Sequence, residues 1–430
     1  MDSGQTANPV EREGRGVFCW ALYDWANSAY PTLIQTFVFA AYFTGSVAPN
    51  KEVGTAWWGH MLSISALIVA LAGPMLGAIA DQTGRRKPWM AGFTLLCCLS
   101  TAFLWYVEPS PDRVWLALIL VGLGTLGVEY ASIFYNAMLP QLVSDKRVGR
   151  WSGYGWALGY AGGLGCLLLA LFGLVEPEWS WLDAQKKEHV RATFVLAAVW
   201  FGVFAVPLFF FTPDSPPTGK PFRQAAVDGC RQLWRSIRDV RRYSQVLQFL
   251  IARMIYNDGV TTIFVFGGIF AEGAFDMSTR KILYFGIALN VTAGLGAALL
   301  ARLDDRLGSK PTIILSLVGL ILASGAMLSV REEVWFWVFG LVLGIFVGPV
   351  QAASRSLMAH LSPPELRNQM FGLYAFSGKA TSFLGPLMVA WVIGSTNSLR
   401  WGLSTVVLLF LVGLGLLWPV RSSREPARSK

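Results

Sequence analysis

The segment Gly77-Ala-Ile-Ala-Asp81-Gln-Thr-Gly84-Arg85-Arg86-Lys87 decides the fold of this chain. Apolar runs at residues 57–80 and 89–107 flank it, and each is long enough to cross the core of a bilayer as a helix. A glycine lets two helices approach closely, an aspartate can cap a helix N-terminus, and arginines anchor at a charged membrane surface. We therefore interpret the segment as a loop between two membrane spans, which acts as a latch that favours one arrangement of helices.

The composition places the whole chain in a lipid bilayer. Of its 430 residues, 54% are apolar and 14% are charged, compared with about 45–50% and about 25% in soluble globular proteins. A water-soluble fold cannot bury that much apolar surface, because single cores stop growing near ~250–300 residues. The length accommodates about twelve helical spans of about 20 apolar residues with their connectors.

Apolar runs bounded by charged residues or Gly/Pro clusters predict an all-α membrane protein with twelve transmembrane helices. They form two six-helix bundles at residues 17–211 and 245–420, with a linker at 212–244 and tails at 1–16 and 421–430. The halves also match in order and at nearly constant spacing, as expected for parallel repeats. Asp81-Gln-Thr-Gly84 corresponds to Asp305-Arg306-Leu-Gly308, and Gly153 corresponds to Gly372. We therefore expect the bundles to be pseudo-symmetric.

The distribution of basic residues orients the spans. Connectors on the side of both chain ends hold 23 of the 35 lysines and arginines, whereas the opposite connectors hold 9. Cytosolic loops of membrane proteins are enriched in these residues, so we expect both termini in the cytosol. The net charge of +9 is then a signal of topology, and we expect no nucleic-acid partner.

The linker has a pattern of its own. Between Phe222 and Val240, apolar residues recur at near-helical spacing beside the seven basic residues of the linker. This pattern is typical of an interfacial helix on an anionic membrane surface. A plain connector between the halves is the alternative that the sequence leaves open.

The loop at residues 77–87 resembles the GxxxDxxGRRK loop of the major facilitator superfamily, and Asp305, Arg306 and Gly308 belong to a weaker copy with Ala301 at the first glycine. Further segments resemble the vacuole-effluxer branch, which contains fungal autophagy-related vacuolar amino-acid exporters and bacterial relatives. The resemblance implies the major facilitator fold and export by alternating access, with amino acids as the substrate class in fungi and an open substrate in bacteria. We expect the chain in a bacterial cytoplasmic (inner) membrane. The segments are Asp24-Trp-Ala-Asn27-Ser28, Tyr135-Asn-Ala-Met-Leu-Pro140, Tyr256-Asn257-Asp258-Gly259, Gln351-Ala-Ala-Ser-Arg355-Ser and Phe371-Gly-Leu-Tyr-Ala-Phe-Ser-Gly-Lys379.

Six ionisable side chains fall inside the predicted spans, where each costs about 2.5–3.5 kcal/mol on insertion scales and is a functional candidate. One interpretation is that they form salt bridges between the halves. The other is that a base holds a substrate carboxylate while an acid faces an amine or a proton, and the two can alternate during a transport cycle. The six are Asp24, Glu129, Arg253, Asp258, Arg355 and Lys379.

We expect polar neighbours to complete a substrate site near the membrane midplane. Spans one and seven are predicted to bend at equivalent places, at Pro31 and at Asp258-Gly259, which frees backbone groups toward a cavity. Glu129 is the predicted proton carrier, because it lies about 20 Å from the outer end of its span, near mid-membrane. The neighbours that we name as candidates are Asn27, Tyr30, Tyr135, Tyr256 and Asn257.

These features predict a secondary transporter for a small polar solute, with amino acids or related metabolites as the expected class and protons as the candidate coupling ion. Export of amphipathic drugs is the alternative within this class, and a non-transporting scaffold or a lipid-handling protein is the alternative outside it. We expect no enzyme, because neither membrane interface has a nucleophile and base constellation. No metal or cofactor is expected either, because the three histidines are few and scattered along the chain. No nucleotide site is expected, since Gly122-Leu-Gly124-Thr-Leu-Gly127 lies in an apolar run without a βαβ context.

Overall fold

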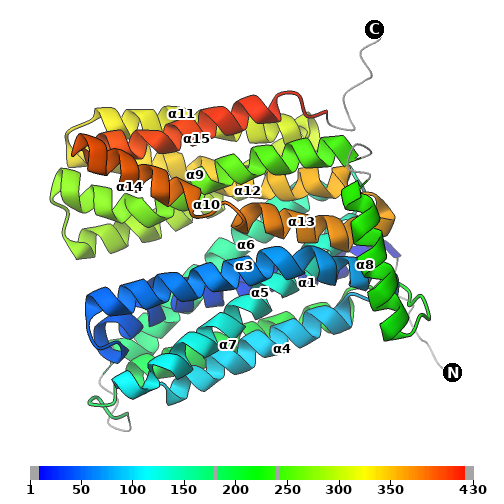
Figure 1. Ribbon diagram of the computed structural model, residues 1–430, viewed down its shortest axis with the longest axis horizontal. Coiled ribbons are helices and arrows are strands. Elements are labelled where there is room, and N and C mark those ends of the chain that lie inside the picture. The colour runs from blue at the N-terminus through cyan, green and yellow to red at the C-terminus, as the bar shows by residue number, and fades with distance from the viewer. Residues whose placement is uncertain (1–8, 178–181, 239–242, 422–430) are drawn as a thin grey trace.

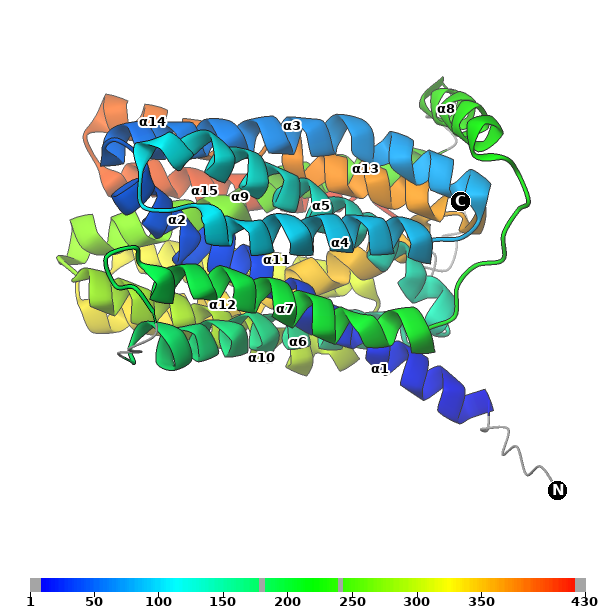
Figure 2. The ribbon, with the colours of Figure 1, turned by 90° about the horizontal axis from the view of Figure 1, so that it is seen from below.

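The computed structural model describes residues 9–177, 182–238 and 243–421, and every regular element over these residues is helical. Long helices run side by side, and one shorter helix lies across an end (Figures 1 and 2). Eleven helices of the described part are long and apolar enough to cross a membrane, so the chain is an integral membrane protein. The main helices are α1 (Pro9–Asn27), α3 (Lys51–Thr83), α4 (Lys87–Phe103), α5 (Val114–Leu142), α6 (Val148–Ala170), α7 (Glu188–Phe211), α8 (Phe222–Arg238), α9 (Ser244–Phe275), α10 (Thr279–Leu307), α11 (Ser309–Ser329), α12 (Glu333–Leu361), α13 (Arg367–Lys379), α14 (Leu384–Thr396) and α15 (Leu399–Leu417).

The helices from α1 to α7 and those from α9 to α15 form two bundles that lie against each other (Figure 1). The contact between the bundles is made mainly by α3 with α13, and by α6 with α10 and α12. Helix α1 begins and α15 ends at the end of the molecule where α8 lies, which we name the linker end. The other end is named the opposite end.

The first predicted span is bent rather than straight. Helix α1 ends at Asn27, and π-helical turns at Tyr30–Phe37 and Phe43–Val47, with α2 (Phe39–Tyr42) between them, carry the chain onward. Pro31 lies at the start of the first turn, where its ring and its missing N–H are incompatible with a regular α-helix. The bend expected at Pro31 is therefore present, and it accounts for eleven long spans in the described part where twelve were predicted.

The second predicted bend is wrong. Helix α9 is continuous through Asp258 and Gly259. Gly259 packs so closely on Phe410 of α15 that a Cβ would lie 2.7 Å from the ring, and this packing stabilises a helical course where the local propensity is poor. The interruption lies instead in span eleven, where turns at residues 380–383 separate α13 from α14.

Candidate transport site

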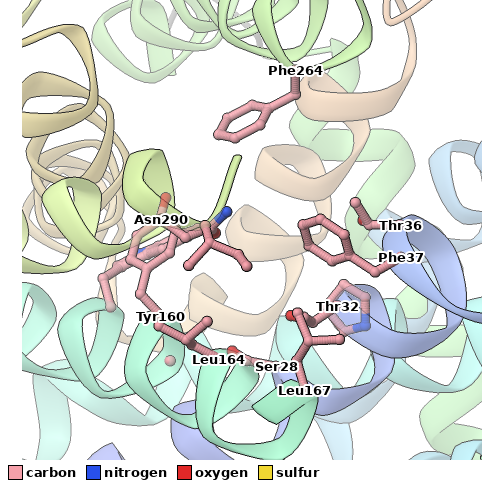
Figure 3. A pocket seen from close by; sticks show the side chains of 13 residues that line it. Ser28, Thr32, Thr36, Phe37, Tyr160, Leu164, Leu167, Phe264 and Asn290 are labelled. Atoms are coloured by element: carbon pink, nitrogen blue, oxygen red, sulfur yellow. The ribbon is translucent and has the colours of Figure 1, made fainter. Parts of the chain in front are cut away.

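A cavity of about 210 Å³ lies between the two bundles. Thr32, Phe37 and Tyr160 from the first half lie across it from Phe264 and Asn290 of the second half (Figure 3). Its described lining is uncharged and consists of hydroxyl, amide, aromatic and aliphatic groups. Residues 31–37 follow α1 toward the opposite end, so the cavity lies nearer to that end than to the linker end.

Apart from Ser28 and Pro31, the residues that line this cavity were not expected from the sequence. Uncharged polar and aromatic side chains are common at packed helix faces in membranes, so sequence alone does not distinguish a cavity wall from a packing surface. The signal that pointed here was the expected bend at Pro31, which itself lines the cavity. Ser28 also lines it and donates a hydrogen bond to the backbone oxygen of Asp24 at 2.8 Å, so Asp24 lies one turn below the cavity.

An ion pair joins the halves on the linker side of the cavity. Arg355 of α12 lies 2.9 Å from Asp24 of α1, and the two side chains are 3% and 14% exposed. The same guanidinium donates to the hydroxyl and the backbone oxygen of Ser152 in α6 at 2.9 and 2.6 Å, and to Asn136 of α5 at 3.3 Å. One buried arginine of the second half thus bonds to three helices of the first half. These bonds must break if the halves separate at this level.

A second ion pair crosses between the halves at Glu129 of α5 and Lys379, the last residue of α13. The carboxylate and the ammonium lie 2.7 Å apart. Their side chains are 25% and 32% exposed, so this pair is more accessible than the one between Asp24 and Arg355. Four of the six predicted charges therefore form salt bridges between the halves in this state, as one of the two interpretations expected.

Arg253 and Asp258 lie within the second half. Arg253 donates to the backbone oxygen of Tyr374 at 2.8 Å and to Ser377 at 2.7 Å. Asp258 is fully buried, and its carboxylate oxygens accept no hydrogen bond from the described residues. The hydroxyl of Thr381, in the interruption of span eleven, and the guanidinium of Arg253 lie near this carboxylate, and both favour its charged form.

The other candidates take part in packing around the site. The three tyrosines are buried, and the two asparagines make long contacts with polar neighbours. The contacts are Tyr30 to the backbone oxygen of Val121 at 2.7 Å, Tyr256 to Ser354 at 2.7 Å, Tyr135 stacked on Trp20 with centroids 4.6 Å apart, Asn257 with Gln351 at 3.5 Å and Asn27 with Ser28 at 3.5 Å.

The loop at residues 77–87 closes the linker end. Asp81, near the end of α3, accepts hydrogen bonds from the backbone N and side-chain Nδ2 of Asn368 at 3.1 and 2.7 Å, and from the backbone N of Gln369 at 2.9 Å. It thereby caps the N-terminus of α13 in the other half. Gly77 lies against the same turn, where a Cβ would lie 2.2 Å from the backbone oxygen of Asn368. This geometry agrees with the predicted latch, and its part in a transport cycle stays a prediction.

The turn after α3 binds the linker. Gly84 has φ of +82°, a left-handed conformation that favours glycine, and it packs against the backbone of Pro216. Asp214 accepts a hydrogen bond from the backbone N of Arg86 at 3.0 Å. The Arg86 side chain is buried, and burial lowers its pKa to about 10, so it keeps its charge at neutral pH. Arg85 is exposed.

The weaker motif copy makes an equivalent contact in the reverse direction. Asp305, near the end of α10, accepts a hydrogen bond from the backbone N of Arg150 at 2.9 Å and pairs with its guanidinium at 3.1 Å. It therefore caps the first turn of α6 in the first half. Gly308 ends α10 with φ of +96°, and Arg306 is exposed. Both halves thus hold each other at the linker end, while the cavity lies toward the opposite end.

The fold and the sequence relatives together identify the chain as a transporter of the major facilitator superfamily, which is not an enzyme. The structure of the proton:xylose symporter XylE bound to 6-bromo-6-deoxy-D-glucose matches with a TM-score of 0.73 at 17% identity, over 97% of each chain. The transporter FucP in the outward conformation matches with a TM-score of 0.76 at 10% identity, over 95% of this chain and 99% of that one. At these identities the likeness concerns the fold, and it confirms the predicted major facilitator fold.

Sequence comparison gives the family. The model of the family "Vacuole effluxer Atg22 like" matches residues 55–428, and the chain belongs to this family, as the resemblance indicated. An uncharacterized MFS-type transporter, YxiO of Bacillus subtilis (strain 168), is 26% identical over 408 residues, which are 93% of each chain. Autophagy-related protein 22 of Cryptococcus neoformans is 27% identical over 301 residues, which are 64% of this chain and 51% of that one.

Proposed function

We propose that this protein is a secondary active exporter of a small polar solute, with amino acids or related metabolites as the substrate class. The observation that carries the proposal is a cavity between the halves, separated from the linker end by ion pairs and helix caps that join one half to the other. A solute in the cavity can pass to the linker end only when these bonds break. Movement of two bundles about a central site is the basis of alternating access in such carriers.

A zwitterionic solute suits the charges below the cavity. Arg355 can bind a carboxylate and Asp24 can bind an ammonium, so a zwitterion replaces both partners of the ion pair at once. Exchange of this kind leaves no uncompensated buried charge, which would otherwise cost several kcal/mol, of order 3–5. Trp156 and Thr32 provide apolar and hydroxyl surface for the rest of the solute.

We assign proton coupling to Glu129. Its protonation removes the attraction to Lys379 and so weakens a bond between the halves. The carboxylate of Glu129 also lies close enough to the hydroxyls of Tyr30 and Tyr130 to interact with them electrostatically. Asp258 interacts with groups of its own half, so its titration leaves the bonds between the halves intact.

We also propose that the linker end faces the cytosol in a bacterial inner membrane. The basic connectors at this end support the orientation, and the Bacillus relative supports the location. Cys230 of α8 is exposed at this end. A membrane-impermeant maleimide should modify it in inverted vesicles and leave it unmodified in intact cells, and the reverse result contradicts the orientation.

Flux from liposomes tests the transport proposal. Vesicles that contain the purified protein are loaded with amino acids and small metabolites, and efflux is followed by mass spectrometry with and without a pH gradient. We expect gradient-driven efflux of zwitterions, and Glu129→Gln should lose the response to the gradient while retaining solute exchange. Glu52→Gln, which neutralises an exposed acid at the opposite end, is the matched control. Wild-type gradient dependence in Glu129→Gln contradicts the proton assignment, and absence of flux for every solute favours a scaffold.

The aromatic lining favours export of amphipathic cations as a second candidate. Phe37, Trp156, Tyr160 and Phe264 line the cavity, and the faces of aromatic rings attract cations. Tetraphenylphosphonium distinguishes the two candidates: it should compete with the solute in a drug exporter and have no effect on an amino-acid exporter.

A further inference from the structure

Helix α8 lies across the linker end, at a steep angle to the spans (Figures 1 and 2). It packs on the last turns of α3 through a glycine. A Cβ at Gly229 would lie 2.8 Å from the backbone of Ile79, and Ala225 on the same face is fully buried. The linker therefore forms a helix that packs on the first half, and its position at a membrane interface stays a prediction.

Gln232 of α8 connects both halves at the latch. It accepts a hydrogen bond from the side chain of Gln82 in α3. Its own amide donates to Gln369 of α13 at 3.3 Å. Gln369 is also one of the residues whose backbone N is capped by Asp81, so α8 bonds to the closed latch itself. Separation of α3 from α13 must break at least one of the two bonds that Gln232 makes.

The free face of α8 is both apolar and basic. Val227 and Trp234 are 45% and 69% exposed, which is unfavourable for a helix surrounded only by water. Four arginines are exposed on the same helix, and they are Arg223, Arg231, Arg235 and Arg238. Aromatic and aliphatic side chains beside clustered arginines complement the acyl boundary and the negative headgroups of an anionic leaflet.

A groove continues from α8 into the membrane-facing surface. It has a volume of about 240 Å³ and is lined almost entirely by apolar side chains of α9 and α13, among them Leu250, Met254 and Phe376. Ser236 of α8 and Gln369 of the latch also line it. An acyl chain in this groove would contact the helix, the latch and span seven together.

We propose that α8 binds anionic phospholipid, with the headgroup on its arginine-bearing face and an acyl chain in the groove, and that the bound lipid holds the linker end closed through Gln232. The lipid binding rests on the exposed face of α8 and on the groove beside it. The effect on closure rests on the proposed alternating-access cycle.

Fluorescence from Cys230 tests the binding. This cysteine is exposed, whereas the other four are buried or half-buried, so bimane maleimide labels it selectively in the full-length protein. The labelled protein is placed in one of two kinds of vesicle, phosphatidylcholine alone or phosphatidylcholine with about one third phosphatidylglycerol. The lipids of both kinds carry brominated acyl chains, which quench the bimane. We expect stronger quenching in the anionic vesicles.

Arg231→Gln with Arg235→Gln should lower this anionic preference about 25-fold, since each basic residue near an anionic surface contributes about a fivefold increase in partitioning. Lys51→Gln with Arg113→Gln removes the same charge from exposed residues at the opposite end and should retain the preference. Equal quenching in both kinds of vesicle overturns the lipid site.

A separate measurement tests closure. In a Cys230→Ser background, Thr32→Cys places a thiol in the cavity, and anionic lipid should increase its rate of modification from the side of the opposite end. Gln232→Ala should abolish this increase while Cys230 quenching in its own background stays lipid-dependent. If Gln232→Ala keeps the full increase, α8 binds lipid without controlling closure. If anionic lipid does not change the modification rate of Thr32→Cys even when Gln232 is retained, the result contradicts the proposed alternating-access cycle. The quenching of Cys230 then still tests the lipid site independently.

Discussion

Replacement of Gly77 by alanine should open the linker end. An added Cβ would lie 2.2 Å from the backbone oxygen and 2.6 Å from the carbonyl carbon of Asn368, and 2.9 Å from the Cα of Gln369. These are backbone atoms, so no side-chain rotation relieves the overlap. To reach an ordinary contact of 3.4 Å, α3 and α13 must separate by about 1.2 Å at this level.

That separation disrupts the cap on α13. The three hydrogen bonds to Asp81, now 2.7 to 3.1 Å long, would stretch to about 4 Å, beyond hydrogen-bond distance. A hydrogen bond to a charged group contributes about 1.5–3 kcal/mol. Loss of two of them without full replacement by water destabilises the closed linker end by about 3 kcal/mol, which shifts the equilibrium between the two end states by about a hundredfold.

The assay is the rate at which an impermeant maleimide modifies Thr32→Cys from the side of the opposite end, in a Cys230→Ser background. We expect the rate to fall in Gly77→Ala, because the cavity is then turned away from that side in most molecules. Gly92→Ala is the matched control, since nothing lies within 4 Å of a Cβ there. Alanine is intrinsically the better helix former by about 0.5–1 kcal/mol, so propensity alone would stabilise both variants. Equal modification rates in both variants refute the latch reasoning.

Two further substitutions separate packing from charge. Arg355→Lys should lower the melting temperature in detergent and weaken closure of the linker end. Lysine keeps the charge that faces Asp24 but lacks the planar group that donates to both oxygens of Ser152, a loss of about 1.5–3 kcal/mol. An unchanged melting temperature contradicts the bidentate role. Gly385→Ala should reduce both the melting temperature and the transport rate, because its Cβ would lie 2.1 Å from Oγ1 of Thr262 in α9. The control is Gly394→Ala, whose Cβ meets open space and which should behave as wild type in the same melting and flux measurements.

The two-bundle fold could be predicted because apolar runs indicate which segments are surrounded by lipid, and basic loops indicate on which side of the membrane the connectors lie. The contacts of the latch could also be predicted, since a glycine allows two helices to approach closely and an aspartate can cap a helix N-terminus. Asp81 and Gly77 accordingly lie at the same turn of α13. The cavity could not be predicted, because residues such as Thr36 and Asn290, which line it, are of the same types as those at an ordinary interface between packed helices.

The position of the helix break shows why local propensity was insufficient. Asp258 and Gly259 are poor helix formers, yet contacts with α15 hold α9 continuous there. Span eleven carries a local signal for its interruption. Pro386 lies in the first turn of α14, where its missing N–H costs nothing, and Ser382 hydrogen-bonds the backbone oxygen of Lys379 at 3.0 Å in place of a helical donor. A proline shortly after a pair of hydroxyl residues therefore indicated the interruption better than an Asn-Asp-Gly run did.

The degenerate motif copy is compensated by its partner helix. In the first copy Gly77 supplies the space for a close crossing, whereas Ala301 stands at the equivalent place in the second copy. There the space comes from Gly153 of α6, where a Cβ would lie 2.4 Å from the Cβ of Ala301. Its repeat equivalent, Gly372, makes the corresponding crossing with Gly73. The motif of one half alone is therefore incomplete, although the interface between the halves keeps a glycine at both crossings. Gly153→Ala should open the linker end, as expected for Gly77→Ala, and the same measurement of Thr32→Cys modification tests it.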